Sequence, residues 1–424
     1  AHSLGLRLDV TDNPRLTAAD SFKVYDSEGK LLDKALDESV RSRFDMMEQE
    51  GLKILKSLDR DVSVETLFAL ASKITRPNFV EHEQPLVNWI KSGIEGWENT
   101  NLDTISSRSH FGEHDITPFS GGDGFMMDGF WKMIEELAKP LEGRILLNHV
   151  VQNVQYNSSG VHIETTAGSY DADYAICTLP LGVLKSGAVN FIPPLPASKQ
   201  KAIKSIGFGC MNKLVLEFPE VFWDADSDGF GYVSKNTLGE YNFFMNIHKL
   251  IKKPILMCFV AADFAYAVET KSDAQIAEEI YSILNKVFGK PGQPVPRPTA
   301  VTFTRWATDQ FARGSYSFMH VGSSEKDVQR LGKPVDRLHF AGEATFHSVG
   351  YVHGAYISGK REAKNILEHM KQQATNVPTP SSTSKQVPVP RQIHVGRMPL
   401  QLQPQLASNN SDPNSLVPPM RSKL

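Results

Sequence analysis

The sequence has few cysteines, no long apolar run and no excess of positive charge. Its three cysteines, at positions 177, 210 and 258 of 424, form neither a disulfide framework nor a CxxC metal site, which indicates synthesis in a reducing compartment. No apolar stretch approaches the roughly 18 residues of a membrane span, and the first twenty residues lack the apolar core of a signal peptide. With 45 Lys and Arg against 48 Asp and Glu, no nucleic-acid partner is expected. We expect a soluble intracellular enzyme of roughly two to three domains.

Aromatic residues are absent from the C-terminal end of the chain. Residues 372–424 contain nine of the 25 prolines but no Phe, Trp or Tyr. Such a segment buries too little apolar surface to offset the entropy of ordering it, so we expect a disordered tail. Its net charge of +4 leaves residues 1–371 with a charge of −7, which is a modestly acidic body.

Hydrophobic periodicity predicts an α/β (α+β) fold with a helical insertion near its start. Residues 37–94 place apolar residues at three- and four-residue spacing, which is typical of helices, and residues 273–288 and 352–370 repeat this spacing. From Arg144 onward, short β-branched runs alternate with Asn, Ser and Gly turns, which predicts consecutive strands. The dinucleotide-binding pattern GxGxxG is absent, because the stretch that begins Gly229-Phe-Gly231 lacks the third glycine.

The segment from Leu338 to Leu367, LHFAGEATFHSVGYVHGAYISGKREAKNIL, is the first that indicates chemistry. A short apolar strand ends in Ala-Gly-Glu, and after a loop a helix begins at Val352 with small residues in its first turn. Such a helix start lets backbone N–H groups approach an electron-rich ligand, and Glu343 is placed to accept hydrogen bonds from ligand hydroxyls. The same residues also fit a tight strand–helix turn with a surface glutamate, and the pattern alone leaves both interpretations open.

This segment resembles the C-terminal signature of the flavin-dependent amine oxidases, which include polyamine oxidases, monoamine oxidases and lysine-specific histone demethylases. The resemblance implies that FAD is the cofactor. It implies that Glu343 bonds the ribityl–phosphate part of FAD and that the backbone of Val352 meets the pyrimidine end of the flavin ring. It also places Tyr351 in one wall of an aromatic cage for the substrate amine.

Two further segments resemble the same family. TRWATDQFARGSYSF (Thr304–Phe318) implies that Trp306 packs beside the flavin and that Tyr316 lies near the substrate amine, which aromatic faces orient well. GFGCMNKLVLEFPEVFWD (Gly207–Asp224) implies that Lys213 is the lysine near flavin N5. Burial would lower the pKa of such a lysine, so that it could hold a water or relay a proton. Strand alternation also allows Lys213 to face solvent, and the Trp and Tyr also fit an ordinary core.

The segments at 121–137, 145–154 and 176–187 complete the resemblance and imply that Val151, Thr178 and Leu179 contact FAD. Peroxisomal polyamine oxidases of the plant and fungal type fit best, because residues 94–106 and 241–249 resemble that group. The demethylases' coiled-coil insertion and extra helical domain have no room in this chain. The resemblance predicts substrate-domain segments at 1–120 and 186–300, FAD-binding segments at 121–185 and 301–371, and the tail at 372–424.

The chain begins with Ala1 at a point past the family's opening βαβ unit, and the family's glycine-rich phosphate loop is not in the sequence. Two interpretations remain: a fragment of a longer enzyme, or a product that binds FAD weakly and is inactive. The predicted function is an FAD-dependent polyamine oxidase. It would oxidise spermine, spermidine or acetylated forms to an imine and reduce O2 to H2O2. The alternative is a truncated, non-catalytic flavoprotein relative that acts as an interaction or regulatory protein.

The last three residues, Ser422, Lys423 and Leu424, form the tripeptide that the peroxisomal import receptor reads. A long disordered tail would present such a signal clear of the folded body. The sequence therefore predicts a peroxisomal location, where the expected product H2O2 can be consumed. The alternative is a solvated basic end that no receptor reads.

Overall fold

The computed structural model describes residues 8–10, 22–111, 124–235 and 238–375. Contacts divide the chain into two compact units, residues 1–367 and residues 368–424. Of the second unit, only the C-terminal end of one helix is described. The expectation of a disordered tail was wrong for residues 372–375, because they continue this helix; residues 376–424, which include the final tripeptide, lie outside the described residues. Within the described residues, no helix is both long enough and apolar enough to cross a membrane.

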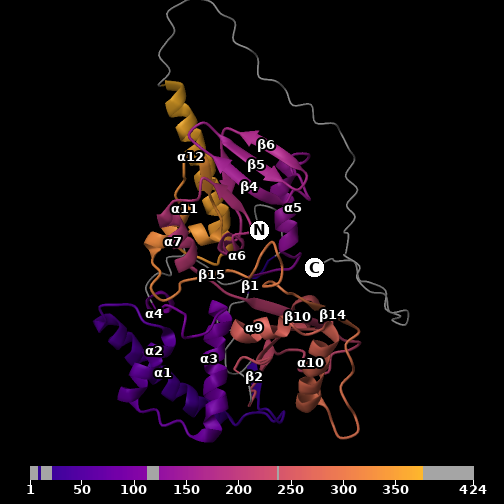
Figure 1. Cartoon of the computed structure of the whole chain (residues 1–424). Coiled ribbons are helices and arrows are strands. Elements are labelled where there is room, and N and C mark those ends of the chain that lie inside the picture. Colours follow the sequence, from indigo (N-terminus) through magenta and orange to yellow (C-terminus); the bar gives the residue numbers. More distant parts are fainter. Residues whose placement is uncertain (1–7, 11–21, 112–123, 236–237, 376–424) are drawn as a thin grey trace, which may run out of the picture. The chain divides into compact units, whose positions relative to one another are not determined.

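A helical layer forms the first large part of the chain, as the spacing predicted (Figure 1). Asp33 and Ser63 cap the first two helices by accepting hydrogen bonds from backbone N–H groups inside them. The two helices pack closely where Gly51 meets Leu67, in a core that includes Phe44 and Phe68. The helices of this layer are α1 (Lys34–Ser57), α2 (Val64–Thr75), η2 (Glu81–Glu83), α3 (Gln84–Glu98) and α4 (Ser107–His110).

A six-stranded sheet carries the largest core. Its strand order is β14-β10-β13-β12-β11-β2, and all neighbours are antiparallel except β11 and β2. The aromatic rings of Phe230 and Phe244 stack inside it, 4.6 Å apart. The strands are β2 (Phe22–Tyr25), β10 (Met211–Glu217), β11 (Gly229–Tyr232), β12 (Phe243–Asn246), β13 (Ile255–Ala261) and β14 (Ala300–Phe303). The helices of this region are α8 (Ile247–Ile251), α9 (Ala262–Glu269) and α10 (Asp273–Phe288).

A second sheet region surrounds a separate core. Four strands run in the order β6-β5-β4-β8, and a parallel pair, β7 and β16, lies beside the same hydrophobic cluster. Its strands are β4 (Val151–Tyr156), β5 (Val161–Thr165), β6 (Gly168–Ala172), β7 (Ala175–Cys177), β8 (Asn190–Ile192) and β16 (Leu338–Phe340). Its helices are α6 (Leu181–Ser186), α7 (Ala197–Ser205), α11 (Glu325–Gly332), η4 (Glu343–Thr345) and α12 (Val352–Thr375).

Two short strand pairs complete the described structure. β9 (Gly207–Phe208) pairs with β15 (Ser317–Phe318), and β1 (Leu8–Val10) pairs with β3 (Gly124–Met126). After β3 come α5 (Phe130–Ala138) and η3 (Lys139–Leu141). The predicted α/β (α+β) class is confirmed, with mixed sheets and with helices in the positions that periodicity indicated.

Candidate active site

Two strand ends bring predicted cofactor residues from distant parts of the sequence together. β7 and β16 are parallel, and the N–H of Ala341 donates to the carbonyl of Cys177 at 3.0 Å. Thr178 and Leu179 follow the first strand and Glu343 follows the second, so they lie at the same edge. The carboxyl ends of parallel strands are where α/β proteins bind nucleotides.

The carboxyl group of Glu343 fastens the loop before α12 to strand β15. The hydroxyl of Ser317 donates to Glu343 Oε1 at 2.7 Å, and the N–H of Gly350 donates to Oε2 at 2.6 Å. Burial raises the pKa of the Glu343 carboxyl above its ordinary value, and these hydrogen bonds oppose that rise. Glu343 thus holds the backbone of Gly350, which directly precedes Tyr351 and Val352. Its contact with FAD stays a prediction.

Tyr316 and Tyr351 come together through Gly350. Gly350 has a φ of +85°, and a Cβ there would stand 3.2 Å from Tyr316 Cδ2. The hydroxyl of Tyr316 donates to the carbonyl of Trp97 at 2.9 Å, and burial raises its pKa, so the phenol stays neutral. Tyr351 is 39% exposed, and its ring stacks against His353 with centroids 5.2 Å apart. The structure therefore brings both predicted tyrosines to one place.

Lys213 and Trp306 lie on neighbouring backbone segments. The N–H of Lys213 donates to Thr304 Oγ1 at 2.9 Å, and the N–H of Trp306 donates to Asn212 Oδ1 at 3.2 Å. Lys213 is exposed, whereas the residues on either side of it, Asn212 and Leu214, are fully buried. The expectation of a buried lysine was therefore wrong, because strand alternation turns its side chain away from the core. Trp306 is 41% exposed.

Short contacts join these two groups. The N–H of Gly209 donates to the carbonyl of Tyr316 at 3.1 Å, and Tyr316 Oη lies 3.9 Å from the sulfur of Met211, two residues before Lys213. The carbonyl of Trp306 accepts from the N–H of Gly314 at 2.8 Å. One continuous set of contacts therefore connects Lys213, Trp306, Tyr316 and the start of α12.

Val151 belongs to the other end of the predicted site. It begins β4 in the four-stranded sheet and packs, like Leu179, against the core beneath that sheet. Thr178 is exposed at the end of β7. The segment before Val151 is open to solvent and carries large exposed apolar side chains, namely Phe130, Trp131, Ile134, Leu137, Leu141, Ile145, Leu146 and Leu147.

Sequence reasoning missed several residues of the site. Trp97 is 66% exposed, and its carbonyl accepts a hydrogen bond from the hydroxyl of Tyr316. It lies in the segment 94–106 that resembles the polyamine oxidases, but the resemblance assigns it no role. Asn212 and Glu269 form buried hydrogen bonds beneath Trp306. The sequence carries no local signal for these two, because their partners are 38 to 94 positions away. Burial is the main cause of the raised pKa of Tyr316, and the charge of Glu98 adds to the rise.

The residues present fit the flavin half of FAD. Three large side chains stay exposed at or near the start of α12, namely Tyr351, Trp306 and Val352, the last with 54% of its surface exposed. A flat aromatic ligand bound there would cover them. Gly342 has a φ of +133° and no heavy atom within 4 Å of the place a Cβ would occupy, so the backbone there is accessible. Trp306, Glu343 and the Val352 backbone would hold the flavin and ribityl parts. Among the described residues, no group of three His, Cys, Asp or Glu side chains is arranged as metal ligands.

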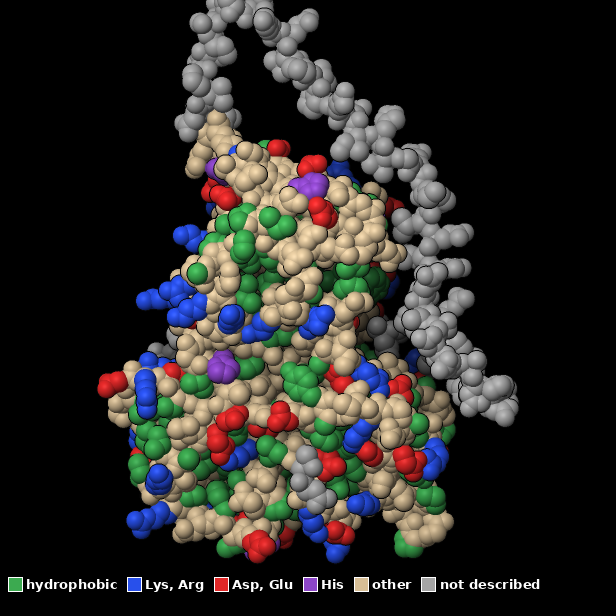
Figure 2. Space-filling model, viewed as in Figure 1, with side chains coloured by type: hydrophobic (Ala, Val, Ile, Leu, Met, Phe, Trp, Pro, Cys, Tyr) green, Lys and Arg blue, Asp and Glu red, His purple; other side chains and the backbone are tan. Residues whose placement is uncertain are grey.

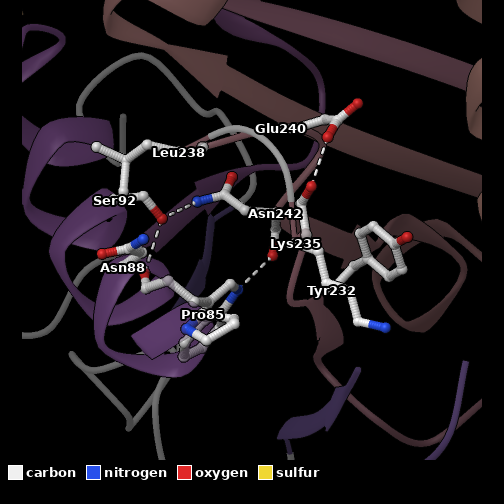
Figure 3. A pocket seen from close by; sticks show the side chains of 11 residues that line it. Pro85, Asn88, Ser92, Tyr232, Lys235, Leu238, Glu240 and Asn242 are labelled. Atoms are coloured by element: carbon white, nitrogen blue, oxygen red, sulfur yellow. Dashed lines mark hydrogen bonds between the residues drawn. The ribbon is translucent and has the colours of Figure 1, made fainter. Parts of the chain in front are cut away.

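A small pocket elsewhere contains none of the predicted site residues. It lies between α3 and the segment after β11, and Figure 3 shows the side chains around it. Asn242 Nδ2 donates to Ser92 Oγ at 2.6 Å, the Trp89 indole donates to the Asn242 carbonyl at 2.8 Å, and Ser234 bonds Glu240. These polar groups form hydrogen bonds with one another. We therefore interpret the pocket as part of the packing between α3 and the segment after β11.

Charge is distributed rather than gathered on the face drawn in Figure 2. Basic side chains form a row across the middle of the view, and acidic side chains lie mainly above and below it, so neither sign covers the face. The net charge of −7 on residues 1–371 is therefore not concentrated into one steering patch on that face.

Comparisons with known proteins identify the family of the chain. Residues 22–367 match the model of the flavin containing amine oxidoreductase family. Lysine-specific histone demethylase 1 homolog 3 of Oryza sativa subsp. japonica is 32% identical over 88% of this chain and 46% of its own length. Polyamine oxidase 5 of the same rice is 34% identical over 87% of this chain and 74% of its own length.

The fold is also similar to that of a solved putrescine oxidase bound to putrescine. The TM-score is 0.65 at 17% identity, and the match covers 87% of this chain and 84% of that one. The chain spans about half the length of several plant histone demethylase homologues that it matches, 46% in the case above. The family model covers most of the chain, and FAD is the cofactor of its members. This chain therefore belongs to the flavin containing amine oxidoreductase family.

Proposed function

We propose that the protein is a polyamine oxidase that acts on spermine, spermidine or their acetylated forms. The observation that carries the proposal is the meeting of Tyr316 and Tyr351 beside Trp306 and the exposed Lys213. Trp306, Glu343 and the backbone of Val352 would hold FAD, which would supply the redox chemistry: acceptance of a hydride from the carbon beside the amine nitrogen and transfer of two electrons to O2 to give H2O2. The imine product is then hydrolysed by water.

The chain's own residues would orient the amine and exclude water. Tyr316 is held by the carbonyl of Trp97, and Tyr351 stands on the loop that Glu343 fastens. Two aromatic faces attract an amine and restrict its orientation, which raises the fraction of productive encounters. Lys213, exposed on β10, would hold a water or a proton near the reacting atoms.

The segments at 94–106 and 241–249, which resemble the peroxisomal polyamine oxidases, support a polyamine over a histone substrate. Identity alone does not separate the two classes, since the chain is 34% identical to the rice polyamine oxidase and 32% identical to the demethylase homologue. The acidic body of residues 1–371 suits a cationic substrate, whether a polyamine or a histone tail. The competing proposals are a lysine demethylase and a non-catalytic relative.

An amine-dependent peroxide assay separates these proposals. The purified chain is loaded with FAD, and bound flavin is checked by its visible absorbance. Spermine, spermidine, N-acetylspermine and a dimethyl-lysine histone peptide are then offered in parallel. Peroxide with the polyamines and none with the peptide supports the proposal. Peroxide with the peptide alone assigns a demethylase, and bound flavin without any turnover assigns the non-catalytic relative.

We further propose a peroxisomal location, because Ser422-Lys423-Leu424 forms the import tripeptide. A fluorescent protein fused to the N-terminus, which leaves the tripeptide free, should give puncta that coincide with a peroxisomal marker. Removal of residues 422–424 should spread the fluorescence through the cytosol. Diffuse fluorescence of the intact fusion, or puncta that persist without the tripeptide, would contradict this location.

A further inference from the structure

A buried carboxylate lies directly beneath the loop that carries Trp306. Glu269 ends α9 and is 8% exposed. The N–H of Ala307 donates to its Oε1 and the N–H of Thr308 to its Oε2, both at 2.8 Å. The two residues after Trp306 are thus bound by the two oxygens of one carboxylate, which fixes the plane of the loop.

The same carboxylate reaches strand β10 through Asn212. Asn212 Nδ2 donates to Glu269 Oε1 at 2.8 Å, while its Oδ1 accepts from Thr304 Oγ1 at 2.9 Å and from the N–H of Trp306 at 3.2 Å. Thr304 Oγ1 in turn accepts from the N–H of Lys213 at 2.9 Å. A chain of three side chains, those of Thr304, Asn212 and Glu269, therefore connects the backbone of Lys213 to the backbone of Trp306 and of the two residues after it.

The protonation states suit this network. Burial raises the pKa of the Glu269 carboxyl, but the hydrogen bonds from Asn212, Ala307 and Thr308 outweigh burial and bring the pKa below its ordinary value. The thiol of Cys210 donates to Glu269 Oε1 at 3.4 Å, and burial together with the nearby carboxylate raises its pKa to about 12. Glu269 therefore stays ionised, and each group around it acts as a donor.

We propose that Glu269 is a positioning residue which, through Asn212 and Thr304, holds Trp306 and Lys213 in the arrangement that amine oxidation needs. The role of these two residues in oxidation rests on the proposed function above. Glu269 would act through these residues, since its carboxylate accepts hydrogen bonds from Cys210, Asn212, Ala307 and Thr308. Its carboxylate is suited to this task because it accepts on both oxygens at once, whereas an amide in its place would direct an NH2 group at one of the backbone donors.

The test measures the loop itself, without relying on activity. The accessibility of Trp306 to acrylamide is measured by fluorescence quenching, and its signal is isolated by subtracting the matching Trp306→Phe protein in each background. Glu269→Gln should raise the quenching constant of Trp306 about twofold, because one backbone donor loses its acceptor and the loop loosens. The matched control is Glu278→Gln, which makes the same change on an exposed carboxylate paired with Arg297 and should leave the constant unchanged.

Thr304 supplies a second, milder pair of variants. Thr304→Val removes the hydroxyl that links Asn212 to Lys213 and should give a smaller rise in quenching, while Thr304→Ser keeps the hydroxyl and should match the parent. If Glu269→Gln does not fold, this pair decides the question. Unchanged quenching in folded Glu269→Gln, or equal behaviour of Val and Ser at 304, would overturn the proposal.

Activity provides the link to the reaction. With a polyamine substrate, Glu269→Gln should lower kcat roughly tenfold and leave KM within about twofold, because orientation of the reacting groups is lost while substrate binding remains. If the parent protein turns over no amine, the proposed function fails, and the quenching result still decides whether Glu269 positions Trp306. If kcat stays normal while quenching rises, Glu269 is structural only.

Discussion

Lys213 is the residue at which sequence and structure differ most. It is exposed on β10 and its side chain supports no core packing, so its removal should leave the fold intact. We expect Lys213→Met to slow flavin reduction or reoxidation by roughly a hundredfold, because an apolar side chain can neither hold a water nor relay a proton. Stopped-flow absorbance of the bound flavin measures both steps. Lys201→Met, an exposed lysine on α7, serves as the control, and near-normal rates in Lys213→Met would remove this residue from the mechanism.

At the residue scale, the sequence allows predictions only for site residues that lie in continuous, recognisable motifs. Tyr316, Glu343 and Tyr351 could be proposed because each lies in a run of neighbours that can be recognised as a unit, and their roles stay predictions. Glu269 and Asn212 could not be found, since their roles exist only through contacts between β10, α9 and the loop after β14. The exposure of Lys213 could have been predicted from the alternation of side chains along a strand. The apolar residues beside it indicated burial instead.

At the element scale, strongly periodic segments were predicted well. The expected helix over residues 273–288 is α10, which spans Asp273–Phe288. Its capping box at Ser272 and Gln275 fixes the start that periodicity alone leaves loose. The parallel pair β7 and β16 was not predicted as a pair, because 160 residues separate Cys177 from its neighbours and no local pattern encodes such pairing.

The joint between α7 and α11 illustrates how one buried lysine stabilises two elements. Lys199 Nζ donates to the carbonyls of Arg330, Leu331 and Lys333, at 3.0, 2.6 and 2.7 Å, and lies 3.8 Å from the centroid of the Phe340 ring. It thereby satisfies carbonyls at the C-terminal end of α11.

We expect Lys199→Met to lower the free energy of unfolding by about 2–4 kcal/mol, since one buried and two half-buried carbonyls lose their donor. Urea denaturation followed by circular dichroism measures the change. Lys201→Met, exposed two residues further along α7, should shift the midpoint little. Equal midpoints for the two variants would show that the three hydrogen bonds contribute nothing net.

At the scale of the whole molecule, the division at Leu367 places every predicted site residue before the tail in one unit. The finer boundaries at 120, 185 and 300 stay predictions. They follow a resemblance in which substrate and cofactor segments alternate along the chain, and such alternation leaves no composition shift to detect. The tail was distinguishable because its composition changes sharply after Lys371.

The stability of the folded unit should depend on pH through Glu95 of α3. Glu95 is 6% exposed and accepts a hydrogen bond from the N–H of Leu102 at 3.1 Å. Burial raises the pKa of its carboxyl to about 7, with Asp263 and Glu65 adding to the rise and the Leu102 hydrogen bond opposing it. An unfolded glutamate titrates near 4.5. The folded state therefore binds more protons between these values, and the contribution of Glu95 to stability falls as pH rises from about 4.5 to about 7.

Glu95→Gln should remove this dependence, because an amide stays neutral and still accepts from Leu102. Relative to the parent, the variant should gain roughly 3–4 kcal/mol at pH 8 and almost nothing at pH 4.5, because the pKa rises from 4.5 to about 7 and each unit corresponds to about 1.4 kcal/mol. Urea midpoints at half-unit steps of pH measure the difference between the two proteins. Glu278→Gln is the matched control: hydrogen bonding to Arg297 lowers the pKa of that exposed carboxyl, so its titration lies below the window. A Glu95→Gln gain that is the same at pH 4.5 and pH 8 would show that relief of poor packing, and not of a buried charge, stabilises the variant.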